Sequence, residues 1–120
     1  MSFDSTLALK NAVAATVTFN RIFSDSSKVS YQNAATGVSD ANKCEISHQM
    51  ATAPDGSDRH LVKFTKLVMD SNLRPRTAVL NVTLAVPRVG ITRTNVDDLI
   101  AEAKEFLVTA NVDRIMRGEL

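Results

Sequence analysis

The sequence predicts an α+β fold: an antiparallel β-sheet that begins with an N-terminal hairpin and is followed by two C-terminal helices. Three observations support this prediction. Alternating and β-branched runs fill the first 86 residues, short polar segments separate these runs, and the residues after position 93 adopt a helical period. Short breaks are typical of antiparallel hairpins, because parallel strands need long crossover connections.

Six strand-like runs follow one another, each bounded by residues that favour turns. They comprise residues 6–10, 14–23, 28–33, 43–52, 59–69 and 76–86. The breaks comprise residues 24–27, 36–42 (around Gly37), 53–58 and 70–75. Pro54, Asp55 and Gly56 predict the clearest turn, because proline presets the first turn position and glycine accepts a positive φ.

The helical segment has a marked start. Thr94 is placed to cap the first helix, and Asp97 follows three residues later, as in a capping box. Apolar side chains then recur at helical spacing and predict one continuous stripe. The stripe comprises Val96, Leu99, Ile100, Ala103, Phe106, Leu107 and Ala110. After Asn111, a second short helical segment is expected to end at Gly118.

The composition predicts a single globular domain over residues 1–120, with 44% hydrophobic residues. A chain of this size has little apolar surface with which to cover both faces of a long sheet, so a partner chain would stabilise it. The segment 6–19 lacks the charged-then-apolar order of a secretory signal, and no apolar run approaches the ~20 residues of a membrane span. We therefore expect a soluble protein with no membrane partner. Cys44 is the only cysteine, and we expect it to be a buried thiol.

The basic residues concentrate in the middle of the chain. Residues 59–93 hold seven Lys and Arg against one acid, a net charge of +6, whereas residues 94–120 hold six acids against three bases, a net charge of −3. A local basic field can attract a polyanion although the whole chain is close to neutral. A scattered, solvated charged surface would have the same composition.

Strand alternation assigns each strand two faces. In the last strand the even positions from Ala78 to Val86 are apolar, whereas Thr77, Asn81 and Thr83 lie opposite. In the strand 43–52, the polar set is Lys43, Glu45, Ser47 and Gln49. Ammonium, guanidinium, amide and hydroxyl groups are those with which proteins bind RNA. Solvated polar faces are also common in antiparallel sheets, so both interpretations stay open.

Few residues of the sequence are candidates for catalysis. Cys44, His48, His60 and Asp58 are the material for a nucleophile and its base, but no local signature supports that role, and Cys44 and His48 fall on the expected core face. The two histidines with one cysteine lack a recognised ligand spacing. We therefore expect no catalytic residue, no metal, no cofactor and no small-molecule substrate.

The layout of the whole chain resembles the coat proteins of single-stranded RNA bacteriophages, the levivirus-like coat proteins. The resemblance rests on the opening hairpin region 6–23, the polar-faced strands 43–86, the loop from Asp70 to Pro75 and the closing segment 94–120. The C-terminal run from Leu80 through Leu120 is the part of the sequence most similar to the family.

The resemblance implies an interlocked dimer, in which two sheets join edge to edge and the helices of each chain pack over the sheet of the other. It further implies that dimers form an icosahedral shell around genomic RNA and that the polar face binds an RNA hairpin as a translational repressor. Carried over by strand position, the RNA-binding residues are Lys43, Ser47, Gln49, Arg59, Lys63, Thr65, Asn81 and Thr83. Arg74 and Pro75 lie in the loop that contacts neighbouring dimers, which is short here.

These implications place the protein in the virion after synthesis in the cytoplasm of a bacterial host, with other copies of itself and single-stranded RNA as partners. Two alternatives stay open. One is a cellular dimeric RNA-binding or translational-repressor protein with a similar sheet, and the other is a small enzyme without a recognisable signature.

Overall fold

The computed structural model describes residues 3, 5–33 and 42–119. Within these residues the chain forms six strands followed by two helices. Their bounds are β1 Thr6–Lys10, β2 Thr16–Ser24, β3 Lys28–Asn33, β4 Asn42–Gln49, β5 Ser57–Met69, β6 Pro75–Pro87, α1 Arg93–Phe106 and α2 Thr109–Met116. The predicted turn 36–42 falls almost wholly outside the described residues.

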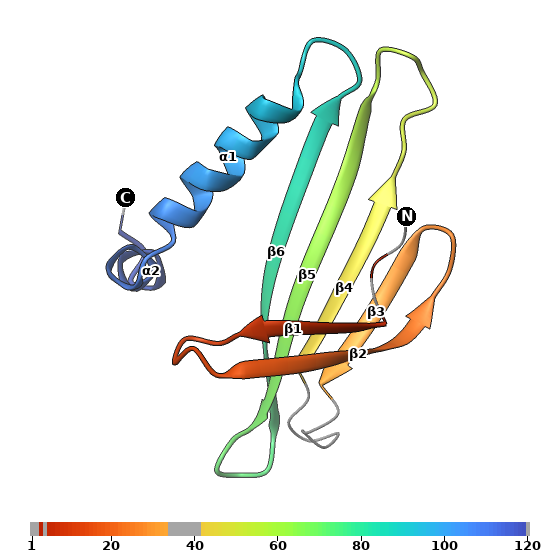
Figure 1. The fold of residues 1–120 in the computed structure, drawn as a ribbon. Helices are drawn as coiled ribbons and strands as arrows, with labels where there is room; N and C mark the ends of the chain where they lie inside the picture. Colours follow the sequence, from red (N-terminus) through yellow and green to blue (C-terminus); the bar gives the residue numbers. More distant parts are fainter. Residues whose placement is uncertain (1–2, 4, 34–41, 120) are drawn as a thin grey trace.

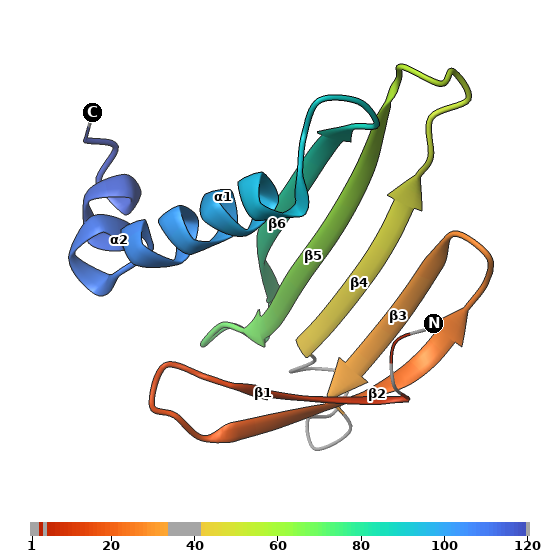
Figure 2. The ribbon, with the colours of Figure 1, turned by 45° about the horizontal axis from the view of Figure 1, so that its top comes forward.

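The strands form one antiparallel sheet in chain order, from β1 at one edge to β6 at the other. Figures 1 and 2 show β3 to β6 running side by side, with the β1–β2 hairpin turned across their direction. The pairing of β2 with β3 shifts register between Arg21 and Phe23, and such a bulge bends a strand and increases its twist. The predicted α+β fold, with a hairpin first and two helices last, is confirmed.

One face of the sheet, here called the apolar face, carries the core. The register aligns Tyr31, Cys44, Phe64 and Leu80 in one row across four strands, and Val29, Ile46, Val62 and Val82 in the next. Leu7, Val17 and Phe19 from the hairpin pack against the part of these rows on β3 to β5. Burial decreases along the first row toward β6. Tyr31 is 0% exposed and Cys44 is 1% exposed, whereas Leu80 on β6 is 55% exposed. The predicted buried thiol is confirmed.

Both helices lie beyond β6 and leave most of the sheet uncovered (Figures 1 and 2). Neither helix contains a buried residue. Only the start of α1 approaches the end of β6, where Val96 and Leu99 face Leu84 and Val86 across a shallow hollow. The predicted apolar stripe is therefore present in the helices, but the part of the chain that the structure describes does not cover it.

The helix boundaries differ from the sequence prediction. Thr92, not Thr94, is the N-cap of α1, and its hydroxyl accepts a hydrogen bond from the Asn95 N–H at 3.3 Å. Asp97 is too far into the helix for a capping box and pairs instead with Arg93, at 2.9 Å. The helix stops at Phe106, and the Asn111 amide donates to the Phe106 carbonyl across the break between the helices at 2.7 Å.

The end of α2 is as predicted. Gly118 has a φ of +72° and donates to the Ile115 carbonyl, while the Glu119 N–H donates to the Arg114 carbonyl. This pair of bonds is the Schellman motif, which glycine permits because it lacks a Cβ. Among the described residues, no helix is long and apolar enough to span a bilayer.

The predicted turn at Pro54 is present, closed by a hydrogen bond from the Gly56 N–H to the Ala53 carbonyl at 3.1 Å. The reason given for Gly56 was wrong, since its φ is not positive. A Cβ at this position would lie 2.8 Å from the Cβ of Ala51, so the close approach of the two chain segments requires glycine.

The second strand begins later than the sequence predicts. It starts at Thr16 rather than at residue 14, because the Asn11 side chain accepts hydrogen bonds from two backbone N–H groups in the preceding turn.

The cap geometry makes a testable prediction. Thr92→Ala removes the acceptor for the Asn95 N–H, and a lost N-cap typically costs about 0.5–2 kcal/mol of stability. Thr94→Ala is the matched control, because Thr94 is inside the helix and caps nothing. Urea unfolding of both variants measures the difference, and an equal effect of the two substitutions would contradict the assigned cap.

Candidate nucleic-acid interface

The register gathers all eight predicted RNA-binding residues on the sheet face opposite the core, here called the polar face. Three rows cross the strands from β3 toward β6, and a fourth lies at one end. They are Gln32–Lys43–Thr65, Ser30–Glu45–Lys63–Asn81, Lys28–Ser47–Leu61–Thr83, and Gln49–Arg59. Because strands lie about 4.8 Å apart, the four-strand rows are roughly 14 Å long. A shallow hollow lined by Ser47, Gln49, Arg59 and Thr83, among others, lies at one end.

The polar face is basic. It carries Lys28, Lys43, Arg59 and Lys63 against Glu45, a net charge of +3 for these side chains. Lys28 and Glu45 form an ion pair at 3.6 Å, whereas the other three cations make no ion pair within the described part of the chain. Unpaired cations on a regular surface are available to phosphate groups.

Other basic residues of the segment 59–93 do not lie free on the polar face, because they form ion pairs or lie on the apolar face. Arg76 pairs with Asp70 at 3.1 Å, and Arg88 pairs with Asp58 at 3.1 Å. Lys66 lies on the apolar side of β5, opposite Ala78. The charge excess in the sequence therefore overstates the charge of the interface, and strand alternation locates it better.

The residues considered for catalysis do not form a nucleophile and base. Burial raises the pKa of the Cys44 thiol, which disfavours the reactive thiolate. His48 lies four residues along an extended strand, roughly 13 Å away. It faces His60 instead, with the two Nδ1 atoms 2.8 Å apart, so one ring donates to the other. This hydrogen bond occupies the Nδ1 atom of each ring.

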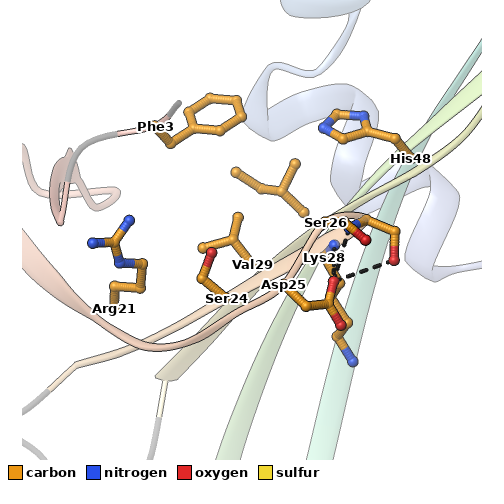
Figure 3. A pocket seen from close by; sticks show the side chains of 10 residues that line it. Phe3, Arg21, Ser24, Asp25, Ser26, Lys28, Val29 and His48 are labelled. Atoms are coloured by element: carbon orange, nitrogen blue, oxygen red, sulfur yellow. Dashed lines mark hydrogen bonds between the residues drawn. The ribbon is translucent and has the colours of Figure 1, made fainter. Parts of the chain in front are cut away.

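A pocket near His48 offers no better arrangement (Figure 3). Phe3, Arg21, Val29 and Ile46 line it together with the turn between β2 and β3. The Asp25 carboxylate of this turn accepts from the N–H groups of Ser27 and Lys28, each at 2.8 Å, which lowers its pKa. It is a structural acceptor that holds the turn.

No family model matches the sequence, and no match is found among curated proteins. Solved structures do match. The chain is similar to the virus-like particle of Wenzhou levi-like virus 1, with 24% identity, a TM-score of 0.69 and coverage of 99% of this chain and 100% of that one. The protein capsid of bacteriophage GA has 14% identity and a TM-score of 0.64, with 96% and 95% covered. The virus-like particle of Beihai levi-like virus 21 has 10% identity and a TM-score of 0.71, with 98% and 95% covered.

The chain has the coat-protein fold of RNA bacteriophages. The match extends over nearly the whole of these chains, so it includes the hairpin, the sheet and both helices. The resemblance seen in the sequence is confirmed at the level of the fold.

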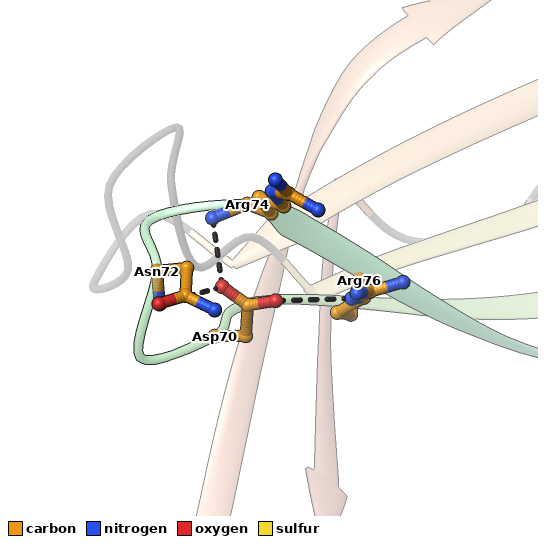
Figure 4. Close-up of polar contacts among 4 residues, drawn as sticks. All are labelled: Asp70, Asn72, Arg74 and Arg76. Carbon is orange, nitrogen blue, oxygen red and sulfur yellow. Dashed lines mark hydrogen bonds and ion pairs between the residues drawn. The ribbon is translucent and has the colours of Figure 1, made fainter.

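The loop between β5 and β6 in this coat-protein fold has a fixed shape (Figure 4). The Asp70 carboxylate accepts from the N–H groups of Asn72 and Arg74, each at 2.9 Å, and from the Arg76 guanidinium at 3.1 Å. Leu73 at the tip adopts a φ of +60° and is 78% exposed. A positive φ is uncommon for a residue with a Cβ, and the Asp70 hydrogen bonds on either side hold this conformation. The sequence prediction named Arg74 and Pro75 as contact residues of this loop and did not single out Leu73 or Asp70.

Sequence reasoning also missed part of the polar face. Lys28, Ser30 and Gln32 lie on it because β3 pairs with β4. Their alternation with Val29 and Tyr31 was a signal for this placement. Glu45 was assigned to the polar face correctly, but it was not recognised as a candidate binding residue.

The hydrogen bonds of Asp70 predict that the stability of this loop depends on pH. Hydrogen bonds, first from the Arg74 N–H and then from the Arg76 guanidinium, lower the pKa of Asp70 below its ordinary 3.8. The carboxylate therefore stabilises the loop above the ordinary pKa, and this contribution is lost as the pH falls through the lower, folded-state value. A carboxyl-carbon NMR titration should place the Asp70 midpoint below 3.8. The protection factors of the Asn72 and Arg74 amides, which correct for the intrinsic slowing of exchange in acid, should fall as the pH drops through this midpoint. A midpoint at or above 3.8 would contradict the assigned bonds.

Proposed function

We propose that this chain is the coat protein of a single-stranded RNA bacteriophage, a non-enzymatic structural protein of the virion made in the cytoplasm of a bacterial host. Dimers of the chain would assemble into an icosahedral shell around genomic RNA. The observation that carries the proposal is the uncovered apolar surface of β6 and the two helices, on a fold shared with a phage capsid and with virus-like particles.

A second copy is the occupant that this surface suits. β6 is a 13-residue edge strand, and a long free edge is a site of pairing with another chain. Leu80 and Val82 on β6 are half exposed, as are Leu99, Ile100 and Phe106 on α1. If two β6 edges pair about a twofold axis, each chain's helices can lie over the apolar face of the other. The same contact would cover both uncovered surfaces.

The polar face is the proposed RNA surface. Its unpaired cations suit phosphates, whereas Asn81 and the hydroxyls of Ser47, Thr65 and Thr83 suit base edges and sugars. Antiparallel pairing would continue the polar rows of one chain into those of its partner and so lengthen the surface. We further propose that this surface binds an RNA hairpin and thereby represses translation.

The loop between β5 and β6 is the proposed contact between dimers. The Asp70 hydrogen bonds fix its shape, and Pro75 restricts both its own φ and the backbone of Arg74. The loop thus presents the exposed Leu73 beside the Arg74 guanidinium to a neighbouring dimer. A fixed apolar tip loses little conformational entropy on contact.

Electron microscopy of the purified recombinant chain tests the proposed function. Closed, uniform particles that contain RNA are the expected result. A soluble dimer that binds RNA and forms no particles would favour the alternative, a dimeric RNA-binding repressor. A monomer that neither assembles nor binds RNA would contradict both.

Phe106→Ala tests the role of the helix stripe in association. Phe106 is 55% exposed in the single chain, and removing a large apolar side chain from a packed site typically costs about 3–5 kcal/mol. We expect sedimentation to show weaker dimers and urea unfolding to show lower stability. Val89→Ala is the control, because Val89 is 69% exposed in the connection before α1. Unchanged association of the Phe106 variant would contradict the packing of helices on a partner.

Lys63→Ala and Lys66→Ala test which face binds RNA. The two lysines lie on one strand but on opposite faces. We expect Lys63→Ala to weaken binding of all RNAs and to reduce the slope of log K against log salt by roughly 0.7–0.9, the effect of one lost phosphate contact. Lys66→Ala should leave the slope unchanged. Equal slopes for the two variants would contradict the assignment of the face.

A further inference from the structure

A single carboxylate lies within the basic polar face. Among the described residues of β3 to β6, Glu45 is the only acid on this face, since Asp58 pairs with Val86 on the other. Glu45 lies in the row between Ser30 and Lys63. Its side chain is 33% exposed, so it is partly enclosed and still reachable.

Lys28 pairs with this carboxylate, and two further lysines lie near it on the same face. Lys28 is 3.6 Å from Glu45 Oε2, Lys63 is directly opposite on β5, and Lys43 is two residues away on the same face of β4. Opposite charges on facing strands stabilise a sheet modestly. An ion pair of this length leaves the carboxylate further acceptor positions, because two oxygens provide about four lone-pair sites.

A carboxylate is costly on a surface that binds only phosphates, because it repels them. It is useful where a ligand presents hydrogen-bond donors, since it only accepts, whereas lysine and arginine only donate. Unpaired RNA bases present donors on their Watson–Crick edges. The guanine edge has two adjacent donors, N1–H and N2–H, that point the same way and match two carboxylate oxygens. Adenine, cytosine and uracil each present one donor group on that edge.

We propose that Glu45 is a specificity-determining residue of the polar face and accepts a bidentate pair of hydrogen bonds from an unpaired guanine. Lys28, Lys43 and Lys63 neutralise phosphates on either side of this base. The inference rests on the proposed RNA binding and adds the class of base that the face selects.

Binding of short unstructured oligonucleotides to the RNA-free full chain, below the concentration at which it assembles, tests the inference. The probes are nine-nucleotide oligouridines with a central G, A, C, U or inosine. We expect the central G to strengthen binding roughly tenfold over U, the order of discrimination of one bidentate base contact. Inosine, which lacks the N2 amino group, should lose most of this preference.

Glu45→Gln provides the decisive variant, because it keeps the shape of the side chain and removes the paired acceptors. It should reduce the preference for G to less than twofold and strengthen binding of the all-uridine probe. Glu102→Gln makes the same charge change on α1, away from the polar face, and should keep the preference for G. Glu45→Ala, measured beside them, removes the side chain altogether and should also lose it.

The outcomes separate the inference from the function on which it rests. Salt-dependent binding of all probes with no preference for G, or a preference that Glu45→Gln retains, overturns the role of Glu45 and leaves RNA binding intact. A preference for C points to a single acceptor contact and also overturns the guanine assignment. No binding of any probe overturns the proposed RNA function and this inference together.

Discussion

The apolar face of the sheet is covered at one end only, and much of the structure depends on how the other end is completed. The hairpin packs over Tyr31, Cys44 and Ile46, but the same rows end on β6 at Leu80 and Val82, which are about half exposed and which no other described element covers. The helices carry a matching apolar stripe and lie beyond the sheet. Burial of apolar surface is worth about 25 cal/mol per Å², so leaving two such surfaces in water is costly when a second copy can cover both.

The two faces of the sheet have different roles in the proposed coat protein, since one packs in the core and the other is proposed to bind RNA. One register places apolar residues on the side of the hairpin and helices, and cations, hydroxyls and amides on the other side. The side chains proposed to contact RNA are therefore held by a core that they do not enter. A one-residue slip of any strand would exchange its faces, so packing and binding constrain the register together. The Asp70 loop lies outside this alternation and has its own hydrogen bonds.

Much of this arrangement could be predicted from the sequence, because alternation in β4, β5 and β6 reports faces directly. The N-cap of α1 could not be predicted, because Thr92 and Thr94 have the same side chain and only the folded backbone, extended at Thr92, distinguishes them. The apolar stripe continues across Leu107, so the sequence placed the break between the helices at Asn111, whereas α1 ends at Phe106 and α2 begins at Thr109. The neighbours of Glu45 were also hidden, because the contact with Lys28 depends on how β3 pairs with β4.

Amide hydrogen exchange along β6 is the most direct test of the pairing of two chains through this strand. In the single chain, only the amides of β6 that face β5 have partners in the sheet, and the alternate amides face outward. The measurement is made on the smallest stable species that sedimentation detects. If two β6 strands pair, the outward amides will exchange slowly, as those facing β5 do. Exchange of the outward amides at the rate of an unstructured peptide would contradict an edge-to-edge dimer.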